Sequence, residues 1–210
     1  MAILMQIDRL TKSVGDRMLF SDVTVGISEG DKIGLIAKNG TGKTTLLRCI
    51  TGIESADSGT VVKRDGLTIG FLEQAPHFDD GATITTEAAR IADEAIEKGI
   101  HSDDAQELAG QFIRLVDQLG ENRRDFPLEK MSGGQRKRVA LAAVLASNPQ
   151  VIILDEPTNH LDIPTVEWLE SYLRRTRSAL LMVTHDRYFL DRVTNQIIEI
   201  DGTQLYTYNG

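Results

Sequence analysis

A Gly-rich segment, Gly34-Leu-Ile-Ala-Lys-Asn-Gly-Thr-Gly-Lys-Thr-Thr45, joins an apolar run to a region of helical character. It predicts a strand over Lys32–Ala37 and a helix over about Lys43–Ile50. Small residues in such a turn let backbone N–H groups close around an anion, and the helix N-terminus adds a partial positive charge. The segment is therefore a candidate phosphate loop, with an ordinary strand-to-helix turn as the alternative. The candidate contacts are Asn39, Gly40, Thr41, Gly42, Lys43, Thr44 and Thr45.

Two side chains of this loop have specific expected roles. Lys43 would neutralise the β- and γ-phosphates of a nucleotide, and the Thr44 hydroxyl would hold Mg²⁺. The motif G-x-x-x-x-G-K-[ST] starts with glycine, whereas this chain has Ala37 at that position. Alanine fits there if φ is negative and is strained if φ is positive.

Polar groups also follow other apolar strands of the chain. The run Val151-Ile-Ile-Leu-Asp-Glu156 ends in two acids, of which Asp155 would bind Mg²⁺ and Glu156 would orient or deprotonate the attacking water. His185 follows a predicted strand over Ala179–Thr184, where it would touch the γ-phosphate and the water. The alternatives are a salt-bridged strand end for the acids and a structural role for the histidine. Gln74, after another predicted strand, is by itself compatible with plain polar surface.

The remaining elements predict an α/β core. Early strands suggest an antiparallel part, in which Thr60–Lys63 and Leu67–Leu72 flank Asp65-Gly66, a hairpin dipeptide. The middle of the chain reads as helical, and strands and helices alternate after Met131. The other predicted elements are strands over Met5–Lys12, Asp22–Ser28, Val151–Leu154, Gln196–Ile200 and Gln204–Tyr208, and helices over Thr86–Lys98, Asp103–Leu119, Gly133–Ser147, 164–175 and Asp186–Val193.

The segment Met131-Ser-Gly-Gly-Gln-Arg-Lys-Arg138 opens one of these helices with three cations in its first turns. Cations there oppose the helix dipole, at a cost of about 0.3–1 kcal/mol each. A phosphate in front of the helix would reverse that effect. A solvated basic face after a Gly-rich turn is the alternative.

Composition excludes several classes of protein. The 210 residues carry 23 basic and 31 acidic side chains, a net charge of −8, which argues against broad binding to nucleic acid or anionic lipid. Residues 75–131 hold 13 of the acids and 6 of the bases. The longest apolar run, Val139–Ala146, is far too short for a membrane span, and the N-terminus shows no signal peptide. One cysteine, Cys49, excludes an internal disulfide and fits a reducing compartment, so we expect a cytoplasmic protein.

Taken together, the order and spacing of these motifs closely resemble an ABC ATPase nucleotide-binding domain over nearly the whole chain. The resemblance implies a RecA-like P-loop core, an antiparallel β subdomain and a helical subdomain over residues 76–148, all within one domain of residues 1–210. It implies that ATP on one domain is capped by the Ser132, Gly133, Gly134 and Gln135 segment of a second. It also places Asp162 at the dimer interface and Gln74 among the catalytic and Mg²⁺-binding residues. Val14 takes the position where the family usually has an aromatic against adenine, so it implies apolar contact and loose base selectivity.

Glu156-Pro-Thr-Asn-His-Leu-Asp162 and Thr184-His-Asp-Arg-Tyr-Phe-Leu190 are similar to the ABC-F subgroup, whose members mostly act on ribosomes. The resemblance implies a Mg²⁺-dependent ATPase that binds ATP and ADP, pairs with a second nucleotide-binding domain and has the ribosome as a further partner. However, only 58 positions separate Gln74 from Ser132, which leaves little room for the RNA-reaching arm of that subgroup. The alternatives are the ATPase subunit of a membrane transporter, a nucleotide binder without turnover, and a monomer that binds weakly.

Overall fold

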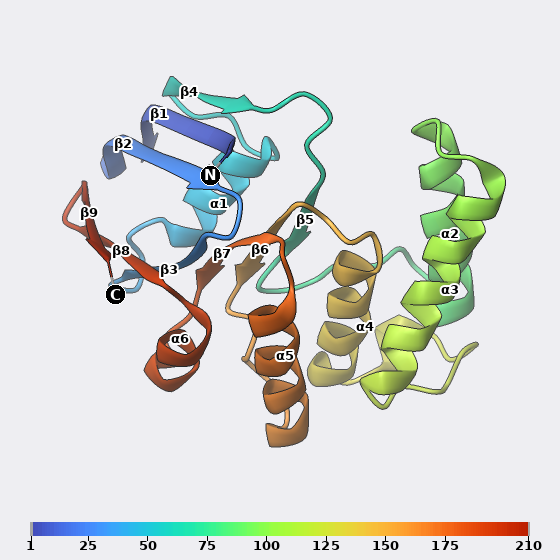
Figure 1. Cartoon of the computed structure of the whole chain (residues 1–210). Coiled ribbons are helices and arrows are strands. Elements are labelled where there is room, and N and C mark those ends of the chain that lie inside the picture. The colour runs from blue at the N-terminus through green and yellow to red at the C-terminus, as the bar shows by residue number, and fades with distance from the viewer. Residues whose placement is uncertain (1, 210) are drawn as a thin grey trace. The chain divides into compact units, whose positions relative to one another are not determined.

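The computed structural model describes residues 2–209, which form two compact units. The first unit comprises Met1–Gln74, Pro149–Thr158 and Trp168–Gly210, and the second comprises Ala75–Asn148 and Asn159–Glu167. Figure 1 shows the path of the chain through both. The predicted helical subdomain over residues 76–148 falls within the second unit, which also takes in the segment around Asp162.

The first unit contains two sheets. A three-stranded antiparallel sheet has the order β2-β1-β4, from β1 (Ile3–Val14), β2 (Arg17–Ser28) and β4 (Ser58–Lys63). A six-stranded sheet has the order β5-β6-β7-β3-β8-β9, and only its β8–β9 pair is antiparallel. Its strands are β3 (Lys32–Ala37), β5 (Ile69–Leu72), β6 (Val151–Asp155), β7 (Ala179–Val183), β8 (Gln196–Asp201) and β9 (Gln204–Asn209).

One hydrophobic core joins these sheets. It takes buried side chains from β1 and β2, from α1 (Lys43–Thr51) and from β3, β6, β7 and β8 of the larger sheet. Figure 1 shows α1 between the two sheets, and Leu47 on this helix is fully buried. Every residue of β6 and β7 is buried, as the unbroken apolar runs predict for central parallel strands.

The short helix α6 (Arg187–Val193) packs closely on β3. A Cβ atom at Gly34 would lie 2.5 Å from Leu190 Cδ2, so glycine at this position lets the helix approach the strand. The strand that leads to the phosphate loop is thereby held between a helix and its neighbouring strands.

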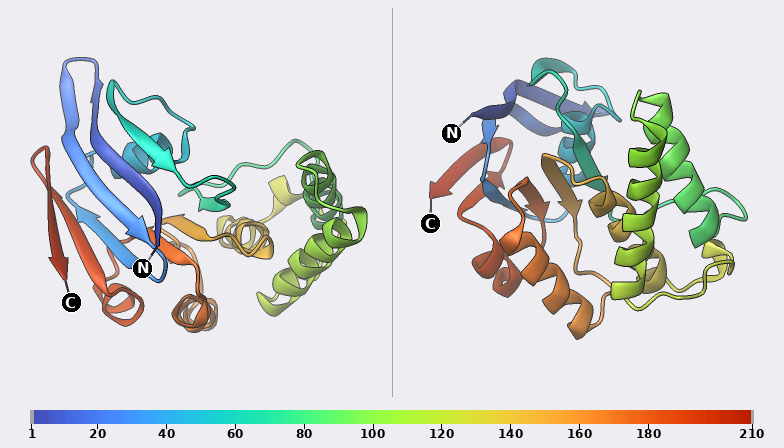
Figure 2. Two further views of the ribbon diagram at one scale, coloured as in Figure 1. Left: turned by 45° about the horizontal axis from the view of Figure 1, so that its top comes forward. Right: turned by 45° about the vertical axis from the view of Figure 1, so that its right-hand side comes forward.

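The second unit is helical, with α2 (Ile84–Glu97), α3 (Ser102–Gln118), the 3₁₀ turn η1 (Leu128–Lys130) and α4 (Gly133–Ala146). Figure 2 shows these helices from two further directions. Small side chains pack α2 against α3, among them Ala92, Ala95, Ala105 and Ala109. The helix α5 (Ile163–Arg175) starts in this unit and ends in the first. These findings confirm the expected α/β fold with an antiparallel part and a helical region. Within the described residues, no helix is long and apolar enough to cross a membrane.

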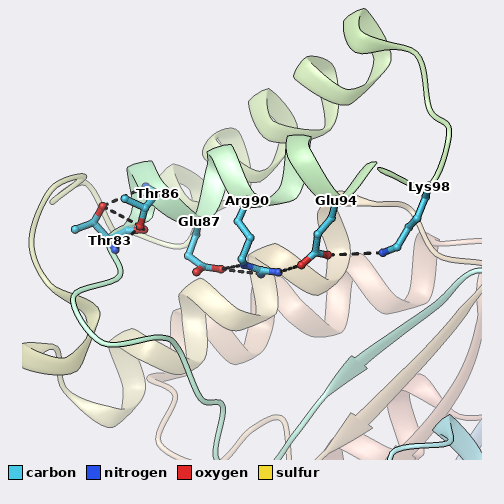
Figure 3. A network of polar contacts seen from close by, with 6 residues as sticks. All are labelled: Thr83, Thr86, Glu87, Arg90, Glu94 and Lys98. Carbon is cyan, nitrogen blue, oxygen red and sulfur yellow. Dashed lines mark hydrogen bonds and ion pairs between the residues drawn. The ribbon is translucent and has the colours of Figure 1, made fainter. Parts of the chain in front are cut away.

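A row of polar contacts lies along one side of α2 (Figure 3). Thr83 and Thr86 form a reciprocal capping box at its start. Arg90 then bridges the nearly buried carboxylate of Glu87, at 2.7 Å, and that of Glu94. The hydrogen bonds that Arg90 donates to Glu87 raise the pKa of Arg90, so this cation stays charged and the three side chains brace successive turns.

The predicted hairpin at Asp65-Gly66 is wrong. The dipeptide does form a tight turn, since the Leu67 N–H donates to the Arg64 carbonyl at 3.1 Å. However, β4 pairs with β1 in the small sheet, whereas β5 pairs in parallel with β6 in the large one. The physical reason is burial: β4 is mostly exposed and suits a sheet edge, while β5 buries Gly70 and Leu72 beside the fully buried β6.

Candidate active site

The predicted phosphate loop runs from the end of β3 to the start of α1. Gly40 and Gly42 both have left-handed backbones, with φ of 78° and 91°. A Cβ at Gly42 would lie 2.8 Å from Leu19 Cβ, so a side chain is excluded on steric grounds as well. Gly42 is also the N-cap of α1 and provides no side-chain cap, which leaves the first backbone N–H groups of the helix for another acceptor. An anion fits this loop.

Ala37 is accommodated without strain. It lies in β3, paired with Ile200 of β8, and it is not among the residues with positive φ. The Ala37 carbonyl accepts a hydrogen bond from Lys43 Nζ at 2.9 Å, and the Lys38 carbonyl accepts a second at 3.1 Å. The departure from the usual glycine therefore leaves the lysine in place over its own loop.

Lys43 sits in a partly buried, acidic environment. Burial lowers the pKa of its ammonium group, and the nearby Glu156 and Asp155 carboxylates act in the opposite direction. The lysine points back over the loop rather than into solvent, so it can meet phosphate oxygens with little rearrangement.

Thr44 and Asp155 meet directly. The Thr44 hydroxyl donates to Asp155 Oδ2 at 2.6 Å, and Asp155 is buried at the end of β6. A hydroxyl and a carboxylate oxygen are hard donors of the kind that Mg²⁺ uses beside phosphate and water. The residues therefore fit a magnesium ion bound together with a nucleotide. Across residues 2–209 no cluster of three His, Cys, Asp or Glu side chains forms a metal site from protein groups alone.

Glu156 and His185 are also brought together. Glu156 Oε1 lies 3.3 Å from His185 Nε2, and its Oε2 accepts from the His185 backbone N–H at 3.4 Å. Glu156 is almost fully buried, and its backbone is left-handed with φ of 48°. Its N–H donates to the Val183 carbonyl at 2.8 Å, so the sheet holds this unusual backbone. The carboxylate is thus fixed in place, with the more exposed imidazole beside it.

Asp155 is the last residue of β6, and Gln74, Glu156 and His185 follow the carboxyl ends of β5, β6 and β7. The phosphate loop follows β3, the fourth strand of the order β5-β6-β7-β3. Parallel sheets place their ligand sites at this edge. The structure accordingly gathers these four residues and the phosphate loop at one edge of the larger sheet, although their roles stay predictions.

Val14 lies at the end of β1, farther along the hairpin than the predicted strand boundary at Lys12. It is 58% exposed and directly opposite Arg17. Arg17 Nη2 donates to the Gly40 carbonyl of the phosphate loop at 2.9 Å. Sequence reasoning missed Arg17, although the Gly15-Asp16 dipeptide between two β-rich runs is a turn signal that points to this pairing.

The segment Ser132–Gln135 lies at the start of α4 in the second unit. The Ser132 hydroxyl accepts from the Gln135 N–H at 3.3 Å, and Gln135 Oε1 accepts from the Ser132 N–H at 3.0 Å, which makes a capping box. A Cβ at Gly134 would lie 2.4 Å from the His160 carbonyl oxygen, whereas Gly133 has open space around its Cα. Gly133 is therefore accessible, whereas Gly134 lies in direct contact with the backbone of the His160 loop.

One of the three cations at the start of α4, Arg138, is paired with carboxylates inside the unit. Arg138 Nε donates to Glu121 Oε1 at 3.1 Å, and Arg138 Nη1 lies 3.5 Å from Asp162 Oδ2. Glu121 is buried, and Lys137 is only 2% exposed. The hypothesis of a solvated basic face is thus wrong for Lys137 and Arg138, because both sit among other groups rather than in water. Glu121 was missed because no local pattern links it to α4.

Asp162 is an exposed anchor at the start of α5. Its Oδ1 accepts from the Thr165 N–H at 3.0 Å. Hydrogen bonding to the Thr165 side chain and to this N–H, together with the charge of Arg138, keeps the pKa of Asp162 below the ordinary value. Asp162 thus stays ionised beside Arg138. The loop that precedes α5 is tied to the start of α4 through this pair.

Comparison with known proteins gives a consistent result. A family model described as ABC transporter matches residues 20–159. The chain is 39% identical to an uncharacterised ABC transporter ATP-binding protein, YfmR of Bacillus subtilis, over 99% of this chain and 38% of that protein. It is 35% identical to the energy-dependent translational throttle protein EttA of Mycobacterium tuberculosis, over 96% of this chain and 41% of that protein. It is 32% identical to ABC transporter F family member 2 of Arabidopsis thaliana, over 98% and 36%.

The chain thus spans about two fifths of the length of these relatives. Among solved structures, it resembles a dimeric post-hydrolysis state of the ATP-binding cassette MJ0796 bound to ADP and Pi. The TM-score is 0.79 at 22% identity, over 98% of both chains. This likeness supports the fold.

Proposed function

This chain belongs to the family of ABC transporter ATP-binding domains and is related to ABC-F proteins, and from that membership we propose that it binds Mg-ATP and hydrolyses it when two such domains pair. The observation that carries the proposal is the shared sheet edge. There the phosphate loop, the Thr44–Asp155 pair and the Glu156–His185 pair follow adjacent parallel strands.

The phosphates of ATP would bind the N–H groups of the loop and the start of α1. Lys43 would exchange its hydrogen bonds with the Ala37 and Lys38 carbonyls for phosphate oxygens, which brings a cation against the charge that develops during transfer. Thr44 and Asp155, with Gln74 at the neighbouring strand end, would hold Mg²⁺. When bound, this ion neutralises charge on the β- and γ-phosphates.

Glu156 is the proposed general base. It would orient a water molecule for in-line attack on the γ-phosphate and accept its proton, while His185 keeps the carboxylate in position and contacts the same phosphate. The nearly buried setting of Glu156 supports this role, because a fixed carboxylate loses little freedom when the water binds.

A second domain would complete the site. Ser132, Gly133 and Gly134 of that domain would cap the γ-phosphate, with Gln135 in the same segment. The open space around Gly133 supports this proposal, since a phosphate can approach the backbone there. The dimer of MJ0796 with ADP and Pi offers a precedent for paired domains on the same fold.

The relation to EttA makes translation a candidate setting for this activity. However, the alignment with YfmR has 236 positions against 210 residues here and spans nearly the whole chain. YfmR therefore holds at least 26 internal positions without a counterpart in this chain. The middle segment is also acidic, which disfavours RNA contact. We therefore propose that this chain hydrolyses ATP and does not itself bind ribosomal RNA.

Phosphate release from Mg-ATP, measured over a series of protein concentrations, tests the proposal. Specific activity that rises with concentration and disappears in Glu156→Gln would support a working pair of domains. Release at the same rate in Glu156→Gln would remove Glu156 from the chemistry. Binding of Mg-ATP without release at any concentration would favour a nucleotide binder without turnover.

A further inference from the structure

Glu121 is a buried carboxylate that the end of α3 places beside the start of α4. Gly120, just past α3, has a left-handed backbone with φ of 81°. Its N–H donates to the Asp117 carbonyl at 3.0 Å, and the Glu121 N–H donates to the Val116 carbonyl at 3.0 Å, which makes a Schellman motif. The end of the helix thus fixes the backbone of Glu121, whose side chain is only 3% exposed.

This carboxylate fixes the direction of the Gln135 side-chain amide. Glu121 Oε2 accepts from Gln135 Nε2 at 3.4 Å, while Gln135 Oε1 accepts from the Ser132 N–H at 3.0 Å. An ionised carboxylate only accepts hydrogen bonds, and a backbone N–H only donates them. The amide of Gln135 therefore satisfies both neighbours in one orientation alone. The reversed orientation would turn its oxygen toward the carboxylate and its NH₂ group toward the backbone N–H.

The capping box that results determines which donors the start of α4 offers. Ser132 Oγ accepts from the Gln135 N–H at 3.3 Å, so the hydroxyl still has its proton to donate. The N–H groups of Ser132 and Gln135 are used within the box. Those of Gly133 and Gly134 belong to the first turn, where a helix has no partner of its own for them. One hydroxyl and two backbone N–H groups are a set that suits the oxygens of a phosphate group.

We propose that Glu121 is a positioning residue, which acts through Gln135 to orient the segment Ser132–Gln135 toward the γ-phosphate on a second domain. This inference rests on the proposed function. Arg138 holds the same carboxylate, since its Nε donates to Glu121 Oε1 at 3.1 Å. Each oxygen of Glu121 therefore has its own partner. Loss of the carboxylate would let the amide of Gln135 turn and should weaken the cap over the second domain's nucleotide.

Exchange of the two side chains tests this orientation directly. Gln135→Glu places a second carboxylate against Glu121 and should slow phosphate release by about tenfold or more. Adding Glu121→Gln gives the new acid a donor instead, and glutamate at this position of a helix forms the same capping box. At one protein concentration, the double variant should therefore release phosphate faster than either single variant.

A mixing experiment distinguishes a role in the cap from a general loss of structure. Chains with Glu121→Gln keep their phosphate loop, and chains with Lys43→Ala keep their cap. In an equimolar mixture half of the random pairs combine the two chains, and each such pair holds one complete site. Release should therefore recover to about a quarter of the wild-type rate, although each variant alone is nearly inactive. A mixture of wild type with Lys43→Ala calibrates the activity of pairs that hold one complete site.

Binding of nucleotide to the variant itself controls for folding. Mg-ATP should raise the thermal midpoint of Glu121→Gln about as much as that of the wild type, because the proposed role concerns the nucleotide of a second domain. If Glu121→Gln does not fold, Gln135→Glu takes its place in the mixture, since it leaves the pair of Glu121 and Arg138 intact.

Two results would overturn the inference. One is a double variant that is no more active than Gln135→Glu. The other is a mixture of Glu121→Gln with Lys43→Ala that recovers nothing under conditions where mixed pairs of wild type and Lys43→Ala are active. The proposed function fails differently: the wild-type chain would then release no phosphate at any concentration, and the inference would fall with it.

Discussion

Replacing Gly134 with alanine would test the close contact between the start of α4 and the backbone of the His160 loop. The added Cβ would lie 2.4 Å from the His160 carbonyl oxygen, about 1 Å closer than an ordinary contact. His160 has a left-handed backbone, with φ of 66°. Because this region of φ and ψ is small for a residue other than glycine, the His160 carbonyl can shift only slightly without leaving it. Gly133, the preceding residue, has no atom within 4 Å of its Cβ position and serves as a matched control in the same helix turn.

The two substitutions share one favourable effect and differ in one unfavourable effect. Both replace glycine with a better helix former, a gain of up to about 0.5–1 kcal/mol in the free energy of unfolding. Only Gly134→Ala adds a methyl group to a filled space, which costs about 1–3 kcal/mol. We therefore expect Gly133→Ala to be at least as stable as the wild type, and Gly134→Ala to be about 2 kcal/mol less stable than Gly133→Ala.

Urea unfolding followed by circular dichroism measures this difference. With a slope near 2 kcal/mol per molar urea, the midpoint of Gly134→Ala should fall about 1 M below that of Gly133→Ala, at an unchanged slope. Equal midpoints would refute the assigned contact between Gly134 and His160. The comparison does not depend on ATPase activity, which both substitutions are expected to impair.

Three further predictions concern charged groups. Glu121→Gln leaves Arg138 without its buried carboxylate and should lower the free energy of unfolding by about 3 kcal/mol, against less than about 0.5 kcal/mol for the exposed Glu97→Gln. Burial lowers the pKa of Lys32 to about 8, so its proton leaves the folded state before the unfolded one. The stability of the wild type relative to Lys32→Met should therefore rise between pH 8 and pH 10.5, and a flat difference across denaturation curves in that window would contradict this. Lys43→Ala should abolish most of the thermal stabilisation by Mg-ATP, whereas Lys38→Ala, in the same loop but exposed, should keep it.

Local sequence patterns predicted the elements that carry the site. The apolar runs of β6 and β7 have hydrophobic side chains at successive positions, which is typical of strands buried on both faces. The acids and the histidine at the ends of these runs mark the carboxyl edge of the sheet. The turn between β3 and α1 needs left-handed backbones at two positions, and the glycines that permit them, Gly40 and Gly42, are visible in the sequence. The α/β core and the grouping of Asp155, Glu156 and His185 at its edge could therefore be predicted from sequence.

Features that depend on distant partners could not be predicted in this way. Asp65-Gly66 has the chemistry of a hairpin turn, but β1 and β6 provide better partners for the flanking strands. Lys137 and Arg138 look like surface cations until Glu121 and Asp162 are placed beside Arg138. Burial of a charged side chain is decided by the partner that the fold supplies, and local spacing carries no record of it.

The left-handed backbone of Glu156 has a consequence for selection. A non-glycine residue in this conformation costs about 1–2 kcal/mol, and glycine or asparagine would relieve much of that cost. Either replacement would also remove the proposed general base. Selection of a random library for thermal stability alone should therefore enrich Gly or Asn at residue 156 and yield robust but inactive variants, so stability and turnover compete at a single position.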